Sequence, residues 1–123
     1  MATDVRSVYR RAMVIALGNV FVRIPERDRV RELMRRTQAE VRSAPGCRRY
    51  DFAEAVDEPG RFTLVQVWDD RAALDRHYRS QAFADYQDAI AVYLVRSSEL
   101  RVHEADAGIV PFDPAPVELT QDD

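Results

Sequence analysis

Two polar residues stand out in this 123-residue sequence because they lie in otherwise apolar segments. Asn19 lies between Leu17 and Phe21 on one face of a predicted strand, where a buried amide must find hydrogen-bond partners or a ligand. His77 follows Leu74 by three residues on a predicted short helix, so it shares the inward side of that helix or its rim. An imidazole with an ordinary pKa of about 6.5 suits proton transfer at neutral pH. We interpret His77 as a candidate base and Asn19 as a candidate anchor for an anion.

Both residues also have a purely structural interpretation. His77 could cap the end of a helix or form a hydrogen bond at the surface, and Asn19 could be satisfied by backbone or water. Trp68 either shapes a pocket or packs in the core beside it. We expect aromatic side chains to wall a substrate pocket, although ordinary core packing is the simpler interpretation of each: Tyr50, Phe52, Phe83, Tyr86 and Tyr93.

Composition and charge argue against several other functions. The net charge is −3 and no face forms a basic stripe, so we expect no nucleic-acid partner. No apolar run approaches the roughly 20 residues of a membrane span, and the N-terminal segment does not resemble a secretory signal, so we expect no membrane contact and a cytoplasmic location. The sequence lacks a glycine-rich phosphate loop, and its two histidines are too few and too far apart to suggest a metal site. We therefore expect neither a metal nor a cofactor.

Hydrophobic periodicity and turn residues define the elements that must position these side chains. Alternating or continuous apolar runs predict strands, and spacing of three and four residues predicts helices. The predicted strands cover residues 13–24, 47–56, 61–68 and 97–105, and the predicted helices cover residues 25–43, 71–78 and 80–93. This order is the split βαβ pattern of an α+β, ferredoxin-like fold, with a four-stranded antiparallel sheet and helices on one face.

Two of the predicted strands, 13–24 and 61–68, are apolar on both faces. In so short a chain the helices cover only one face of the sheet well, and an apolar second face needs a partner. We therefore expect a homodimer in which two sheets pack face to face.

Three regions are expected along the chain. Residues 1–12 would form an N-terminal arm, residues 13–107 the ferredoxin-fold domain, and residues 108–123 an extended tail. The tail is apolar around residues 109–112, so we expect it to pack on the partner subunit.

Three segments resemble the antibiotic biosynthesis monooxygenase family of dimeric α/β-barrel proteins: APGCRRYDF (44–52), PGRFTLVQVWDDRAALDRH (59–77) and SQAFADY (80–86). The resemblance extends over about residues 13–105 and implies the dimeric α/β barrel. It also implies an apolar pocket between sheet and helices in each chain.

The resemblance does not reproduce the site of the anthrone-type monooxygenases. Trp68 matches their tryptophan, but their asparagine and tyrosine fall at Leu64 and Leu74. The chain is similar to the haem degraders at Asn19, whereas their haem-ligating histidine falls at Gln87.

His77 also matches a histidine of an isomerase branch and of quinol-monooxygenase-like members. A pocket tryptophan of the haem degraders falls at this same residue, and the second histidine of the isomerases falls at Ala82. None of these characterised sites is complete in this chain.

The resemblance implies a cofactor-independent monooxygenase that uses molecular oxygen to oxidise a phenolic, quinol or polyketide-like aromatic substrate. His77 would assist deprotonation, Asn19 would hold the oxyanion and Trp68 would shape the cavity. Two alternatives stay open, because one scaffold supports many functions. One is a non-redox isomerase or cyclase. The other is a non-catalytic dimeric module that binds a ligand or takes part in a stress response.

Overall fold

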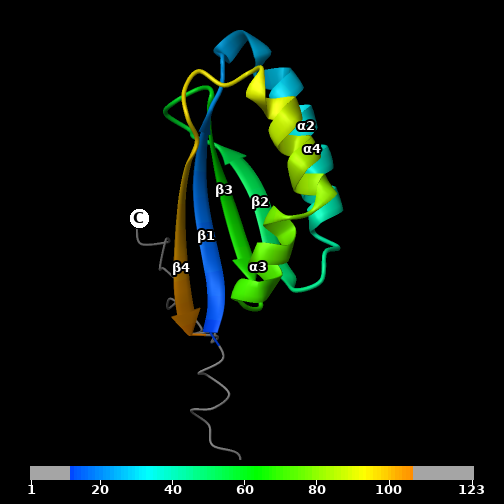
Figure 1. Cartoon of the computed structure of the whole chain (residues 1–123). Helices are drawn as coiled ribbons and strands as arrows, with labels where there is room; N and C mark the ends of the chain where they lie inside the picture. The colour runs from blue at the N-terminus through cyan, green and yellow to red at the C-terminus, as the bar shows by residue number, and fades with distance from the viewer. Residues whose placement is uncertain (1–11, 107–123) are drawn as a thin grey trace, which may run out of the picture.

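The computed structural model describes residues 12–106, which form a four-stranded antiparallel sheet with its helices on one face (Figure 1). The sheet order is β2-β3-β1-β4, so the fold is ferredoxin-like, as predicted. The elements in chain order are β1 (Ala12–Phe21), the 3₁₀ helix η1 (Ile24–Glu26), α2 (Arg27–Val41), β2 (Cys47–Glu54), β3 (Arg61–Trp68), α3 (Arg71–Tyr78), α4 (Gln81–Ala91) and β4 (Glu99–Asp106). The predicted tail, and the predicted arm apart from its last residue, lie outside the described residues.

The helices begin where their capping residues predict. The Asp70 carboxylate accepts a hydrogen bond from the Ala73 amide at 2.9 Å and starts α3. The Ser80 hydroxyl oxygen accepts one from the Phe83 amide at 3.2 Å and starts α4. The first strand ends earlier than predicted, at Phe21, because the chain turns there into η1.

Gly46 brings the loop before β2 against α3. Its φ is +83°, a left-handed conformation that L side chains rarely adopt. A Cβ at this position would lie 2.6 Å from the Cβ of Ala73. The absence of a side chain therefore lets α3 sit close to the end of the sheet.

Strand β3 shows most clearly how the sheet separates its two faces. Its buried and half-buried residues alternate strictly along the strand. The buried set faces the helices and consists of Phe62, Leu64, Gln66 and Trp68. One core cluster lies against α3 and the end of α2, and a second lies against α2 and α4.

The helices leave β4 largely uncovered. Figure 1 shows α2 and α4 on the side of β2 and β3, with β4 at the far edge of the sheet. Leu100 pairs with Gly18 in register and faces the helical side, yet it is 48% exposed. This arrangement leaves an opening between β4 and the helices.

The second face of the sheet carries an apolar strip without a covering layer among the described residues. Ile15, Val65 and Val67 are half-buried there, and Leu17 is 39% exposed. The strip ends at Phe21, where the guanidinium of Arg96 lies 3.7 Å from the ring centroid. We call Ile15, Leu17, Val65 and Val67 the apolar strip.

Within residues 12–106, no helix is long and apolar enough to cross a membrane.

Candidate active-site cavity

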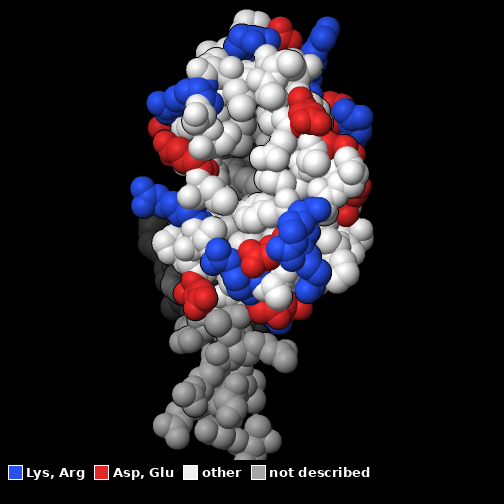
Figure 2. All heavy atoms as spheres, in the orientation of Figure 1, with Lys and Arg blue, Asp and Glu red and all other residues white. Residues whose placement is uncertain are grey.

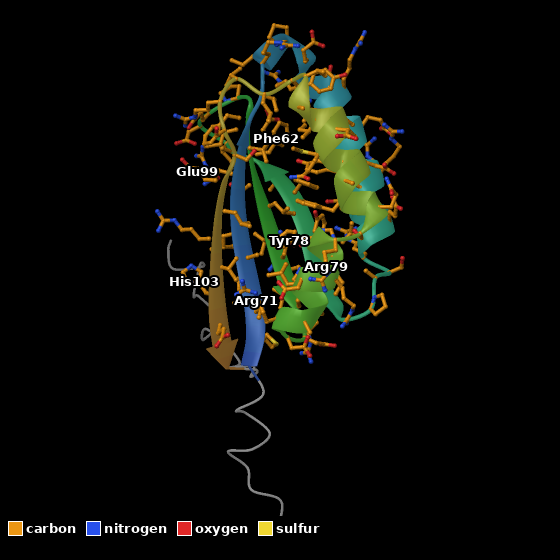
Figure 3. The ribbon with its side chains drawn as sticks, in the orientation of Figure 1. Phe62, Arg71, Tyr78, Arg79, Glu99 and His103 are labelled. Carbon is orange, nitrogen blue, oxygen red and sulfur yellow. The ribbon has the colours of Figure 1, made fainter. Side chains whose placement is uncertain are left out.

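An apolar cavity of about 270 Å³ lies between the sheet and helices α3 and α4, where the sequence led us to expect a pocket. Figure 2 shows it as the hollow in the middle of this face, and in Figure 3 Tyr78 and Glu99 lie on either side of the opening. The lining residues from the sheet are Gly18, Val20, Leu64 and Gln66. Strand β4 adds Glu99 and Leu100 at the edge of the sheet. The helices and the chain between α4 and β4 add Tyr78, Phe83, Tyr86, Gln87, Ile90, Leu94 and Ser98.

Gln66 is the polar residue of the cavity floor. Its side chain is 1% exposed, and its Oε1 accepts a hydrogen bond from Trp68 Nε1 at 3.0 Å. An indole N–H only donates, so the bond requires the carbonyl end of the amide to face Trp68. The Gln66 N–H groups therefore occupy the other end of the side chain.

Two tyrosine hydroxyls of the cavity lining are buried. Neither Tyr78 nor Tyr86 has a hydrogen-bond partner for its hydroxyl among residues 12–106. Burial raises the pKa of both phenols, and the nearby Gln66 side chain partly offsets this for the pKa of Tyr78. Both hydroxyls are therefore protonated at neutral pH and can donate to a ligand.

His77 does not line the cavity, although it contacts two residues that do. Its ring stacks on Trp68 with centroids 5.0 Å apart, and Tyr50 lies edge-on at 5.3 Å. Phe83 and Tyr78 complete the enclosure at 5.1 Å and 5.5 Å. The imidazole is 4% exposed, and its Nε2 has no hydrogen-bond partner among the described residues.

Burial of His77 changes its acid–base character. It lowers the pKa of His77 to about 4, because the charged form would lose its hydration in this aromatic surrounding. His77 is therefore neutral at pH 7, the state of a proton acceptor, but it is a weak base. The sequence-based expectation used an ordinary pKa, which holds only for an imidazole in contact with water.

Asn19 lies on the opposite face of the sheet from His77. Side chains alternate along β1, so Gly18 and Val20 face the cavity while Asn19 points to the uncovered face. There its Oδ1 accepts a hydrogen bond from Thr63 Oγ1 at 3.0 Å. The structure therefore does not bring the two expected catalytic residues together within one chain.

The expected aromatic walls divide into two groups. Phe83 and Tyr86 line the cavity as well as packing in or against the second core cluster. Tyr50, Phe52 and Tyr93 pack in or against the core clusters and do not line this cavity. Trp68 is fully buried and reaches the cavity only through its hydrogen bond to Gln66.

Sequence reasoning missed Gln66 and Tyr78 as site residues. Gln66 carried a signal, since it is a polar residue on an apolar face of a strand, the criterion that selected Asn19. No sequence pattern indicated Tyr78 as a site residue. It is the last residue of α3, and its position in the cavity depends on where that helix ends against the sheet.

The described part of the chain contains no cluster of three or more histidine, cysteine, aspartate or glutamate side chains that could hold a metal ion. The cavity lining offers polar groups from Gln66, Tyr78, Tyr86, Gln87, Ser98 and Glu99.

Comparison with known proteins identifies the family. The model of the family described as antibiotic biosynthesis monooxygenase matches residues 13–89, more than half of the chain. The chain belongs to this family. The match covers β1 to most of α4 and so includes the cavity floor and most of its helical wall.

Several other proteins are similar to this chain in sequence or in structure. The uncharacterized protein sll1783 of Synechocystis is 28% identical over 91 residues, which cover 74% of this chain and 62% of that protein. Rv0793 of Mycobacterium tuberculosis is 27% identical with a TM-score of 0.68, over 85% of this chain and 99% of the other. A Deinococcus radiodurans protein named for the same family is 23% identical with a TM-score of 0.76, over 81% and 99% of the two chains, and shows the fold alone.

Proposed function

We propose that this protein is a cofactor-independent monooxygenase that oxidises a small phenolic, quinol or polyketide-like aromatic compound in the cavity between sheet and helices. One observation carries the proposal: an apolar, partly enclosed cavity whose buried polar groups are hydrogen-bond donors at neutral pH, from Gln66, Tyr78 and Tyr86. Membership of the antibiotic biosynthesis monooxygenase family supports it.

The chemistry explains why such a cavity is useful. Ground-state oxygen is a triplet and reacts slowly with closed-shell molecules, so the substrate must supply an electron. A phenol does so far more readily after it loses its proton. Donors in an apolar site stabilise the resulting anion, because they act there without competition from water.

The overall reaction balances without an added reductant. A phenol with an unsubstituted para carbon would become a quinone. One atom of oxygen enters the ring, and the other leaves as water with the two hydrogens that the substrate loses. The four electrons taken from the substrate are the four that reduce the oxygen molecule.

His77 would have a subordinate part in this reaction. It is neutral at pH 7 and packs against Tyr78, so it is in the correct state to take a proton. With a pKa of about 4 it would hold that proton weakly. We therefore assign most of the driving force for ionisation to the donors around the substrate oxygen.

We also propose that two copies pair through the apolar strip. Ile15, Leu17, Val65 and Val67 form a surface that water would otherwise contact, and family members are commonly dimeric. Asn19 would then lie at the interface, next to its partner Thr63.

Oxygen consumption and product mass test the proposed function. Metal-free protein should consume oxygen with at least one member of a panel of quinols and naphthols, and the product should carry one more oxygen and two fewer hydrogens. A product of unchanged mass would favour an isomerase or cyclase. Recovery of every compound unchanged, with binding, would favour a ligand-binding module.

A further inference from the structure

We propose that Gln66 is the group that holds the ionised oxygen of the bound aromatic, and that Trp68 is a positioning residue that fixes the Gln66 amide for this task. The inference rests on the proposed function and assigns its anion-binding step to one amide. It also narrows the ligand to a small aromatic with an ionisable hydroxyl.

The hydrogen bond between the two side chains is buried on the helical face of β3. Trp68 and Gln66 are 0% and 1% exposed, and their bond measures 3.0 Å. Burying an amide without full hydrogen bonding costs about 1–3 kcal/mol, and an apolar residue would avoid this cost. A ligand that uses the amide gives a reason for its presence in an apolar layer.

The indole settles which end of the amide faces the ligand. Trp68 Nε1 can only donate, so it occupies the Gln66 oxygen and leaves the two N–H groups for the cavity side. Without this donor the amide could rotate by half a turn and present its oxygen, which would repel an anion. The indole thus sets the polarity of the cavity floor.

Tyr78 provides a second donor beside Gln66. The Gln66 amide lies within hydrogen-bonding reach of the Tyr78 oxygen and so lowers the pKa of Tyr78, but the contact lacks the geometry of a full hydrogen bond within residues 12–106. This contact is weak, so a ligand oxygen that accepts hydrogen bonds from both groups can replace it. A phenolate oxygen accepts several hydrogen bonds and fits this arrangement.

The charged groups nearby do not supply the stabilisation. Glu99 stands at the rim of the cavity on β4 and would oppose an anion. On α3, Arg71 acts on the pKa of Tyr78, but its Nε also lies 3.3 Å from the carboxylate of Asp75. The anion is therefore held by neutral dipoles, as in an oxyanion hole.

The size of the cavity limits the ligand. At about 270 Å³ it lies just below the usual range of about 300–1,000 Å³ for small-molecule pockets. We therefore expect a compound of one or two rings, with its hydroxyl directed to the floor and its hydrocarbon part between Val20 and Ile90.

4-Nitrophenol tests the inference without depending on turnover. Its hydroxyl ionises near neutral pH with a change in absorbance, and its nitro group makes it a poor electron donor to oxygen. The wild-type protein should bind the phenolate roughly tenfold more tightly than the neutral phenol, so that the pKa of the bound probe falls. The methyl ether 4-nitroanisole serves as a ligand of similar shape that cannot ionise.

Substitution of Gln66 should remove this preference. Gln66→Leu should bind phenolate no better than phenol and keep its affinity for 4-nitroanisole. Gln66→Glu should reverse the preference, because a carboxylate on the floor repels the phenolate. Gln38→Leu is the matched control, since Gln38 Oε1 accepts a hydrogen bond from the Phe52 amide at 3.1 Å and Gln38 does not line the cavity.

Trp68→Phe should lower the preference for phenolate while Gln66 is still present, an effect that a purely structural tryptophan would not have. The double variant Gln66→Leu/Trp68→Phe removes both partners and avoids an unpaired indole N–H, so it guards against misfolding. Retention of the phenolate preference in Gln66→Leu or in the double variant would overturn the inference, as would a wild-type protein without it. Failure to consume oxygen with a normal phenolate preference would instead refute only the proposed reaction.

Discussion

Each face of the sheet carries one polar amide, and the two amides have different surroundings. Gln66 lies under α3 and α4, is 1% exposed, and receives a hydrogen bond from an indole. Asn19 lies on the uncovered face, is half-buried, and receives a hydrogen bond from Thr63. In both cases the hydrogen bond is accepted by the amide oxygen, so the N–H groups of the same amide remain available for another acceptor.

The difference lies in what surrounds those N–H groups. Around Gln66 they meet a cavity with two tyrosine hydroxyls that have no hydrogen-bond partner among residues 12–106. Around Asn19 they meet a surface continuous with the apolar strip, which two copies of the chain would bury. An amide in an apolar strand is thus a sign of function only when the face that it occupies is known.

Gln66→Leu should have the largest effect on catalysis. Loss of one oxyanion donor typically lowers turnover about 10²–10³-fold, so oxygen consumption with the best substrate should fall by that factor. Asn19→Leu is the comparison, and we expect less than a tenfold change because Asn19 lies on the other face. An equal loss in both variants would return the anchoring role to Asn19.

Leu17→Arg should break the proposed pairing of the sheets. A two-fold interface would bring two arginines into the apolar strip, and such a repulsion costs several kcal/mol. We expect the dissociation constant of the dimer to rise roughly 100-fold or more in analytical ultracentrifugation. Val56→Arg is the control, because Val56 lies in the β2–β3 turn and is fully exposed. A monomeric wild-type protein at micromolar concentration would contradict the pairing.

The fold could be predicted from the sequence because its signals are local. Asp70 and Ser80 cap the helices they precede, and the residues of β3 alternate within eight positions. The site could be predicted only in part, because its properties come from contacts between elements. The pKa of His77 depends on four rings from β2, β3, α3 and α4.

The face that Asn19 occupies is the clearest example. The sequence placed it correctly with Leu17 and Phe21, but alternation alone does not say which set faces the helices. That choice follows from the crossover of the chain through α2 and from the pairing of β1 with β3 and β4. Gln66 could have been found by the same polarity argument, since it interrupts an apolar face of β3.

Acidification should lower the free energy of unfolding, because His77 is buried in its neutral form on the helical side of the sheet. The pKa of His77 is lowered to about 4 in the folded protein and is about 6.5 in the unfolded chain. A neutral imidazole therefore stabilises the fold fully above pH 6.5, and this contribution falls as the pH decreases toward 4. Between pH 6.5 and 4.5 we expect a loss of about 2 kcal/mol in the free energy of unfolding, measured by urea denaturation.

His77→Phe is the control for this pH dependence, because it keeps an aromatic ring in the enclosure and cannot titrate. Its stability should change much less over the same interval. The stabilisation from Asp51 and Glu54, whose pKa values are lowered by arginine partners, begins to fall only near the lower end of the interval, and it does so equally in wild type and variant. Equal slopes in wild type and variant would show that His77 does not have the lowered pKa.

The smallest effect should come from the hydrogen bond on the uncovered face. Thr63→Val removes the donor to Asn19 Oδ1, and Asn19→Leu removes the acceptor. A partly buried bond between neutral groups contributes about 1 kcal/mol, so each single variant should lose about that much in urea denaturation. The double variant should lose clearly less than the sum, because neither partner is then left unpaired. A coupling near zero would mean that Asn19 is held by something other than Thr63, and the contrast with Gln66 would then rest on the cavity alone.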